Sequence, residues 1–179
     1  MSEPSSPTGD VRCGDAVVVV DDDQDDVALD LDRWGRLAAA ALDVEGVSGE
    51  LTLTFIDRTA ITALKIEHFG DAGEHPTDVL SFPLDAPGYV DDDGLPVLLG
   101  DVVICPAVAA EQFHDHAGTL DDELALLVVH GVLHVLGHDH AEADDAALMR
   151  SRELALLEQL HWGGPAPAGF RSIHSEEVA

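Results

Sequence analysis

Positive charge is the scarcest property of this 179-residue sequence, which has 8 Lys and Arg residues against 36 Asp and Glu residues. Lys65 is the only lysine, and the formal net charge is −28. Affinity for phosphate comes largely from Lys and Arg side chains that release counterions. The composition therefore excludes a protein that holds nucleic acid by non-specific charge attraction.

Cysteines and long apolar runs are also scarce. Cys13 and Cys105 provide neither a disulfide framework nor a Cys-x-x-Cys zinc pair. No apolar run approaches the length of a membrane span. The first residues have neither the basic start nor the apolar stretch of a signal peptide. We therefore expect a cytoplasmic protein.

Histidine is abundant, and it is concentrated in the segment 130–140. His130 and His134 are four residues apart, so an α-helix places their side chains on one face. Gly137 can end that helix in a left-handed cap and turn the chain back, which would bring His140 to the same place. The spacing His-x3-His-x2-Gly-x2-His is that of a three-histidine zinc site with an open fourth position.

Two alternatives to a non-protease zinc site have to be considered for this segment: buried core histidines and a metalloprotease. The surrounding residues are apolar almost all round, so a lone histidine there would be a hydrogen-bonded core residue. Two histidines at helical spacing, then glycine and a third histidine, favour a metal. A metalloprotease of the metzincin type needs Glu directly after the first histidine as its general base, and Gly131 stands there instead.

The segment resembles the signature of the YbeY family, metal-dependent endoribonucleases of bacterial ribosomal RNA. It matches at the three histidines and at Gly131, Leu133, Gly137 and Asp139, while His138 replaces the usual tyrosine. Residues 76–83 (Pro-Thr-Asp-Val-Leu-Ser-Phe-Pro) and 99–106 (Leu-Gly-Asp-Val-Val-Ile-Cys-Pro) resemble two further family blocks. The resemblance covers about residues 50–160.

The resemblance implies a single-strand-specific, zinc-dependent endoribonuclease that acts in 16S rRNA 3′-end maturation and ribosome quality control. It implies one Zn²⁺ per chain, held by His130, His134 and His140, although nickel or another divalent ion could occupy such a site. The implied partners are rRNA and the small ribosomal subunit. The nucleophile is either a metal-activated water or the neighbouring 2′-hydroxyl of the RNA.

Other residues in these blocks are candidates for the remaining roles. Asp139 could orient a ligand or accept a proton, or it could be a turn residue that bonds its own backbone. His138 could donate to a phosphate or lie in solvent. The candidates for lining the cleft are Thr77, Asp78 and Ser81, whose alternation is equally typical of a half-buried strand.

The cation that many family members carry before the Thr-Asp-Val-Leu-Ser-Phe block is missing. No arginine lies between Arg58 and Arg150, so Arg58 and Lys65 are the only candidates for a cation at the phosphate. In so acidic a chain the interpretation of both as surface ion-pair partners is favoured over that role. This departure and the net charge keep a non-catalytic, metal-containing ribosome-assembly factor open as an alternative, with a metallopeptidase as the third.

The periodicity predicts an α+β fold of one domain over residues 1–179, with a core at about 14–162 and flexible tails at 1–12 and 163–179. We expect a four-stranded mixed sheet flanked by about five helices, with a zincin-like helix and turn. The family resemblance implies the same fold, with the metal site in a cleft beside the sheet. The predicted strands are 17–20, 51–55, 79–82 and 97–105. The predicted helices begin near Asp25, Asp57, Pro106 and Thr119 and after His140.

The acidic, lysine-poor composition has two explanations. One is a salt-rich cytoplasm, where repulsion between surface charges is screened within about 3 Å at 1 M salt. The other is a site whose local positive potential comes from the metal itself.

We hypothesise a salt-adapted origin, and it predicts that the melting temperature rises between low and molar KCl. The reason is that screening removes the self-repulsion of 36 acidic side chains. Thermal unfolding followed by circular dichroism over a KCl series measures this, and a melting temperature that does not rise would contradict the hypothesis.

Overall fold

Apolar residues that alternate with polar ones build the strands of a single sheet in the computed structural model of the chain. The structure describes residues 8–70, 75–85, 95, 97–139 and 141–172. The strands are β1 (Thr8–Cys13), β2 (Ala16–Asp23), β3 (Gly49–Ile56), β4 (Val79–Pro83) and β5 (Leu98–Ile104). The α-helices are α1 (Leu31–Val44), α2 (Arg58–Phe69), α3 (Pro106–Gln112), α4 (Leu120–Val135) and α5 (Ala143–Leu157), with a 3₁₀ turn η2 (Phe113–Asp115) and a π-helical turn η3 (Glu158–Trp162).

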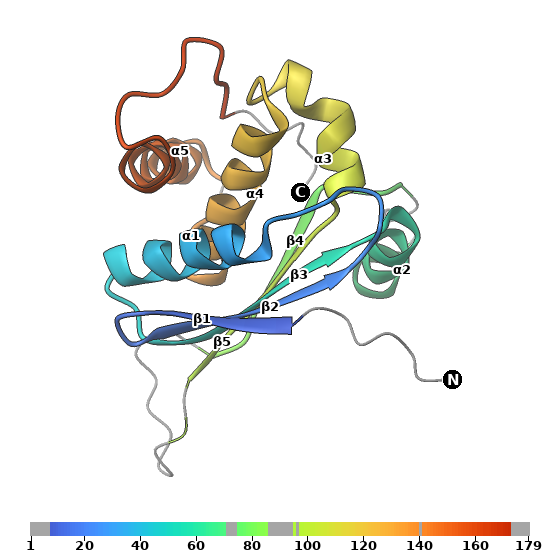
Figure 1. Cartoon of the computed structure of the whole chain (residues 1–179), viewed down its shortest axis with the longest axis horizontal. Helices are drawn as coiled ribbons and strands as arrows, with labels where there is room; N and C mark the ends of the chain where they lie inside the picture. The colour runs from blue at the N-terminus through green and yellow to red at the C-terminus, as the bar shows by residue number, and fades with distance from the viewer. Residues whose placement is uncertain (1–7, 71–74, 86–94, 96, 140, 173–179) are drawn as a thin grey trace.

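The sheet has the strand order β1-β2-β3-β5-β4 (Figure 1). The central strands β2, β3 and β5 are parallel, and the edge strands β1 and β4 pair antiparallel to them. In β3 the side chains of Leu51, Leu53 and Phe55 are fully buried and alternate with partly exposed neighbours, as the sequence predicted. The mixed α+β fold is thus confirmed, with five strands in the described residues in place of the expected four.

The fifth strand is β1, where the sequence predicted a flexible tail. That prediction is wrong from residue 8 onward, because Thr8–Cys13 pairs with Ala16–Asp23 through a tight turn. The strand lies at the sheet edge and exposes much of its length, so it lacks the apolar run that marks a central strand. Residues 1–7 lie outside the described part of the chain.

The predicted tail at residues 163–179 is also placed as far as residue 172. The Phe170 ring packs edge-on against Trp162 at a centroid distance of 4.8 Å. The Arg171 backbone N–H donates to the His116 carbonyl at 3.1 Å. This stretch therefore folds back over η2, and residues 173–179 lie outside the described part.

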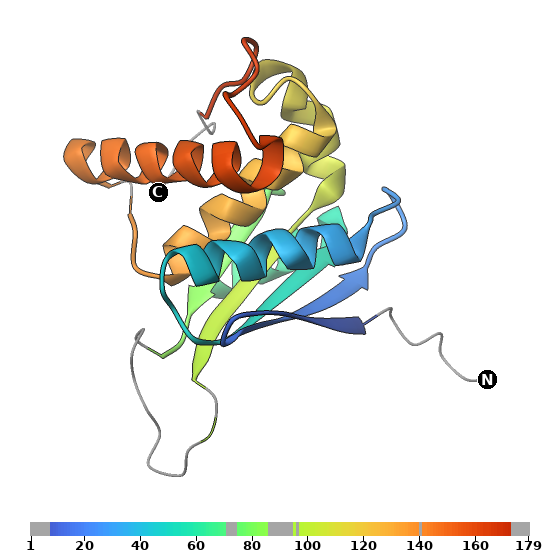
Figure 2. The same ribbon diagram turned by 60° about the vertical axis from the view of Figure 1, so that its left-hand side comes forward.

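The helices form layers on both faces of the sheet. α1 and α4 pack on one face, and α5 lies across the outer side of α4 (Figures 1 and 2). α2 covers the other face, where Ile61 packs with Val103 and Cys105. Val102 and Ile104, which alternate with them, belong to the core beneath α1 and α4.

The helix starts follow side-chain caps. Asp57 accepts from the Ala60 N–H at 2.8 Å, and Thr119 accepts from the Asp122 N–H at 3.1 Å, as the sequence predicted. α1, however, begins at Leu31 and not near Asp25, since Asp30 accepts from the Arg33 N–H at 3.2 Å and serves as its cap. A later aspartate in an acidic segment thus provides the cap.

The most apolar helix is α4, which has 16 residues. A helix needs about 20 apolar residues to span a bilayer. Over the described ranges, no helix is long and apolar enough to cross a membrane.

A glycine sets how closely α4 approaches the sheet. A Cβ at Gly131 would lie 2.4 Å from Cγ1 of Val102 on β5, closer than any real contact. α4 therefore packs with its backbone against β5 at this point, and any larger residue would push the helix away. The absence of the protease Glu at this position has a steric basis in the fold.

We predict that Gly131→Ala lowers the free energy of unfolding by about 1–3 kcal/mol, the usual cost of overpacking, although alanine favours a helix over glycine by about 1 kcal/mol. The cost should be smaller in a Val102→Ala background. Urea unfolding of the four proteins of this cycle measures it. Gly164→Ala, where a Cβ meets nothing within 4 Å, is the control, and an equal effect at both glycines would contradict the packing argument.

Candidate functional site

α4 places His130 and His134 on one face, as their spacing predicted. The centroids of the two imidazole rings are 4.5 Å apart and the ring planes meet at 78°. His130 is buried, with 7% of its surface exposed, whereas His134 is half-buried. The pair thus lies where the buried face of α4 reaches the solvent.

The end of α4 matches the predicted reversal. Gly137 has a φ of +100°, and its N–H donates to the His134 carbonyl at 3.0 Å. The His138 N–H donates to the Leu133 carbonyl at 3.0 Å, which completes the turn. His140, the third predicted ligand, lies outside the described residues. In the part of the chain that the structure describes, no three His, Cys, Asp or Glu side chains gather as a metal site.

A carboxylate from another helix contacts the first histidine. Glu153 of α5 is 1% exposed, and its Oε1 is hydrogen-bonded to Nδ1 of His130. A carboxylate at Nδ1 keeps the proton on that nitrogen and the lone pair on Nε2. Histidines that bind metals are held in this way, with the second nitrogen on a carboxylate, and the contact raises their basicity as ligands.

The sequence contained a signal for Glu153. It lies four residues after Met149 and three before Leu156, and all three side chains are buried in α5. A carboxylate within an apolar stripe needs a partner, because its burial is otherwise costly. The identity of that partner, 23 residues away, could not be read from the pattern.

β4 is the edge strand beside α4; of the predicted cleft residues it holds Ser81, while Thr77 and Asp78 directly precede it. Ser81 Oγ donates to the Gly131 carbonyl at 3.3 Å, one residue from His130. Asp78 lies at the other end of α4, where Gln112 Nε2 donates to its Oδ2 at 2.6 Å, and the Thr77 hydroxyl is 3.4 Å from its Oδ1. Ser81 is therefore next to the histidine pair, while Asp78 and Thr77 are near the first turn of α4.

Glu123 anchors this first turn. Its side chain is fully buried and accepts from Gln112 Nε2 at 3.1 Å and from the Ala117 N–H at 3.2 Å. Nδ1 of His116 is a third neighbour, at 3.2 Å. Gln112 thus bridges two carboxylates and joins α3 to both β4 and α4, a contact that sequence analysis missed because it depends on tertiary packing.

The candidates after the reversal are closer to solvent. Asp139 is exposed, and its Oδ1 accepts from the Ala141 N–H at 3.3 Å. Such a local bond is typical of an aspartate in a turn, and the orienting or proton-accepting role of Asp139 stays a prediction. His138 is half-buried.

The two candidate cations are on α2, across the sheet from the histidine pair. Arg58 is ion-paired with Glu111 and donates to the Ala107 carbonyl at 3.4 Å. The side-chain hydrogen bond to Glu111 raises the pKa of the Arg58 guanidinium above its usual value. Lys65 Nζ donates to the His75 carbonyl at 3.2 Å. Neither cation is on the α4 face of the sheet.

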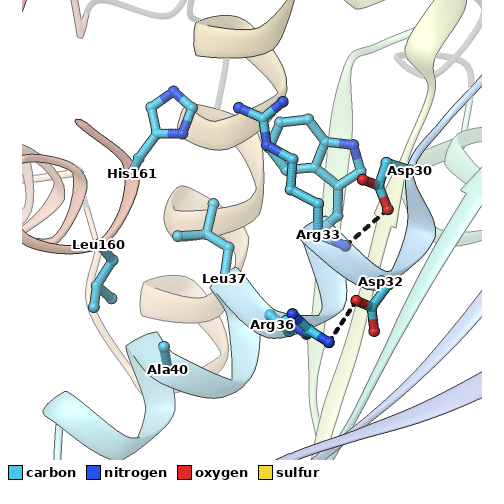
Figure 3. A pocket seen from close by; sticks show the side chains of 9 residues that line it. Asp30, Asp32, Arg33, Arg36, Leu37, Ala40, Leu160 and His161 are labelled. Atoms are coloured by element: carbon cyan, nitrogen blue, oxygen red, sulfur yellow. Dashed lines mark hydrogen bonds and ion pairs between the residues drawn. The ribbon is translucent and has the colours of Figure 1, made fainter. Parts of the chain in front are cut away.

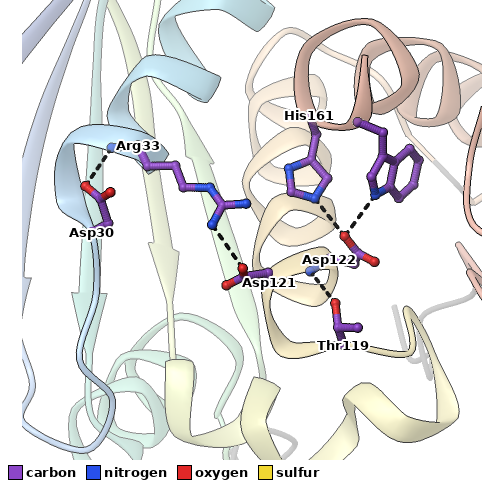
Figure 4. Close-up of polar contacts among 7 residues, drawn as sticks. Asp30, Arg33, Thr119, Asp121, Asp122 and His161 are labelled. Atoms are coloured by element: carbon purple, nitrogen blue, oxygen red, sulfur yellow. Dashed lines mark hydrogen bonds and ion pairs between the residues drawn. The ribbon is translucent and has the colours of Figure 1, made fainter. Parts of the chain in front are cut away.

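A separate cavity of about 370 Å³ lies where α1 meets η3 (Figure 3). Arg33 and Arg36 enter its wall, but Arg36 is paired with Asp32 and Arg33 with Asp121 on α4 at 3.0 Å. Next to Asp121, Asp122 accepts from His161 Nε2 at 2.7 Å and from the Trp162 indole at 2.9 Å (Figure 4). These contacts join α1, α4 and η3. Both arginines of the cavity wall are therefore ion-paired with aspartates of the protein itself.

Comparison with known proteins shows similarity over most of the chain. The family model described as Endoribonuclease YbeY matches residues 19–161. A protein from Thermobifida fusca with the same description is 41% identical over 158 residues, covering 84% of this chain and 92% of the relative. One from Kineococcus radiotolerans is 42% identical over 155 residues, covering 81% of this chain and 88% of the relative.

A solved structure has the same fold. The solution structure of a Thermotoga maritima protein superposes with a TM-score of 0.58 at 23% identity, covering 82% of this chain and 89% of that protein. The family model spans all three sequence blocks, the histidine pair on α4 and Glu153 on α5. The chain belongs to the YbeY family of endoribonucleases.

Proposed function

We propose that this protein is a zinc-dependent endoribonuclease that cuts single-stranded RNA in 16S rRNA 3′-end maturation and ribosome quality control, with the small ribosomal subunit as its partner. The observation that carries the proposal is the His130–His134 pair with Glu153 behind His130, in a chain of this family. One Zn²⁺ per chain would be held by these two histidines and His140.

The described residues fit such an ion. Neutral imidazoles are common zinc ligands, and the Glu153 carboxylate selects the Nδ1–H tautomer of His130, which leaves the lone pair on Nε2 for the ion. The two rings come from one rigid helix whose depth is set by Gly131. A bound divalent ion supplies Lewis acidity at the phosphate and a water of lowered pKa.

The chain's own groups have distinct roles in this proposal. Glu153 orients His130, and the half-buried His134 faces the substrate side. His138 and Asp139, in the reversal after α4, are the proposed donors and acceptors of protons at the reacting phosphate. Since both candidate cations are on the other face of the sheet, positive potential at the phosphate comes from the ion in this account.

A metallopeptidase is disfavoured by the packing of α4. The general base of that mechanism follows the first histidine directly, where Gly131 has no room for a Cβ beside Val102. A glutamate there would displace the helix that carries both histidines.

Cleavage of a labelled single-stranded RNA in high salt tests the function. We expect cleavage by the zinc-loaded protein, loss after metal stripping, recovery on adding zinc, and loss of at least about 100-fold in His134→Ala, since a ligand and the open site are removed together. Stoichiometric zinc binding without cleavage, together with co-sedimentation with small ribosomal subunits, would instead support the non-catalytic assembly factor.

Glu153→Gln tests the arrangement behind His130. Replacing the carboxylate removes its charge from Nδ1, so zinc affinity should fall by about 10–100-fold while the fold is kept. Competition with a chromophoric chelator measures the affinity, and Glu158→Gln, in the turn after α5, is the matched control. Equal zinc affinity in Glu153→Gln and the parent would contradict the orienting role.

A further inference from the structure

The last turn of α2 combines rings and a cation on the surface. The ring of His68 is 4.6 Å from that of Phe82 on β4, with the planes at 44°. Phe69 is 57% exposed. Lys65 lies one turn earlier, three residues before His68 and four before Phe69, so its side chain neighbours both on the helix surface. We call Lys65, His68, Phe69 and Phe82 the α2 platform.

These groups are scarce elsewhere in the chain. Aromatic residues make up 4% of the sequence, and Lys65 is its only lysine. Over the residues that the structure describes, Phe69 is the only exposed Phe, Trp or Tyr; the others are buried or half-buried. The chain thus places an exposed ring, its lysine and one ring of the His68–Phe82 pair in the last residues of α2, which solubility alone does not require.

The α2 platform adjoins the histidine pair across an edge strand. β4 pairs with β5 on one side only, and its successive side chains point to opposite faces. Ser81 faces α4 and contacts the Gly131 carbonyl, whereas Phe82 packs on the α2 face with Ile61. Consecutive residues of β4 thus face α4 and the α2 platform on opposite sides of the sheet edge, so a chain molecule that passes around this edge can contact both.

The chemistry of the α2 platform fits single-stranded nucleic acid. Unpaired bases stack on aromatic faces whatever their sequence, and a lysine beside the rings takes the backbone phosphate. Stacking does not depend on net charge, so it supplies affinity that a chain of charge −28 cannot obtain from cations. Protein–protein interfaces are depleted in lysine relative to the rest of the surface, so Lys65 beside the rings favours nucleic acid over an apolar protein partner.

We propose that the α2 platform stacks bases of single-stranded RNA that flank the phosphate bound at the histidine pair. This inference rests on the proposed function, and it assigns Lys65 to the phosphate of a flanking nucleotide instead of the reacting one. It makes His68 and Phe69 binding residues that favour RNA with unpaired bases next to the bound phosphate.

The test measures binding separately from cleavage. The probe is a short fluorescein-labelled single-stranded RNA, titrated with the full-length, metal-stripped His134→Ala protein and followed by fluorescence anisotropy. Phe69→Ala in this background should weaken binding by about 5- to 100-fold, and Phe69→Trp should restore it. On the same RNA backbone with abasic sites, Phe69→Ala should have no effect, because no base is left to stack. His68→Ala should behave as Phe69→Ala does.

Val44→Ala is the control, since Val44 is an exposed apolar residue at the end of α1 on the other face of the sheet. Unchanged binding in both ring variants, equal losses on the normal and abasic RNA, or no RNA binding by the parent would each overturn the inference. The protein that keeps His134 is also loaded with zinc and tested for cleavage. If it cuts no RNA while Phe69→Ala and His68→Ala weaken binding, the α2 platform is supported and the nuclease proposal is overturned. If cleavage depends on the metal but Phe69→Ala and His68→Ala bind RNA as the parent does, the nuclease proposal is supported and the α2 platform is overturned.

Discussion

The contact between Gly131 and Val102 is the constraint on which the candidate site depends. It sets α4 directly against β5, so that the backbone of the helix approaches the sheet. Only at this depth does the Gly131 carbonyl meet Ser81 of the edge strand β4. The same placement turns His130 under α5, where the Glu153 carboxylate meets its ring. The absence of a Cβ at Gly131 thus sets the distance of α4 from the sheet, its contact with β4 and the orientation of His130.

The charge of the molecule and the chemistry of its site can be reconciled on this basis. Most acidic side chains are on the surface, whereas Glu123 and Glu153 are buried and hydrogen-bonded within the fold. Glu123 joins α3 to the start of α4, and Glu153 joins α5 to the second half of α4. A buried carboxylate is costly unless it is satisfied, so these two contacts specify how α3 and α5 pack on α4. Neither candidate cation, Arg58 or Lys65, is on the α4 face of the sheet, which makes an ion and base stacking the two proposed sources of RNA affinity.

Local sequence signals predicted the parts of the fold that depend on one element alone. The alternation in β3, the caps at Asp57 and Thr119, the helical pair His130 and His134, and the reversal at Gly137 all follow from short-range patterns. Contacts between elements were missed, because periodicity shows that Glu153 is buried but not what it meets. The strand β1 was missed for a related reason, since an edge strand is recognised by its partner β2 and not by its own polar composition.

The central claim is that α4 and the turn after it hold one ion with three imidazoles. X-ray absorption at the zinc edge of the zinc-loaded protein tests this most directly. The account predicts three histidine nitrogens and one light atom at about 2.0–2.1 Å, with one imidazole lost in His140→Ala. A sulfur ligand, or a shell with fewer than three imidazoles in the parent protein, would contradict it.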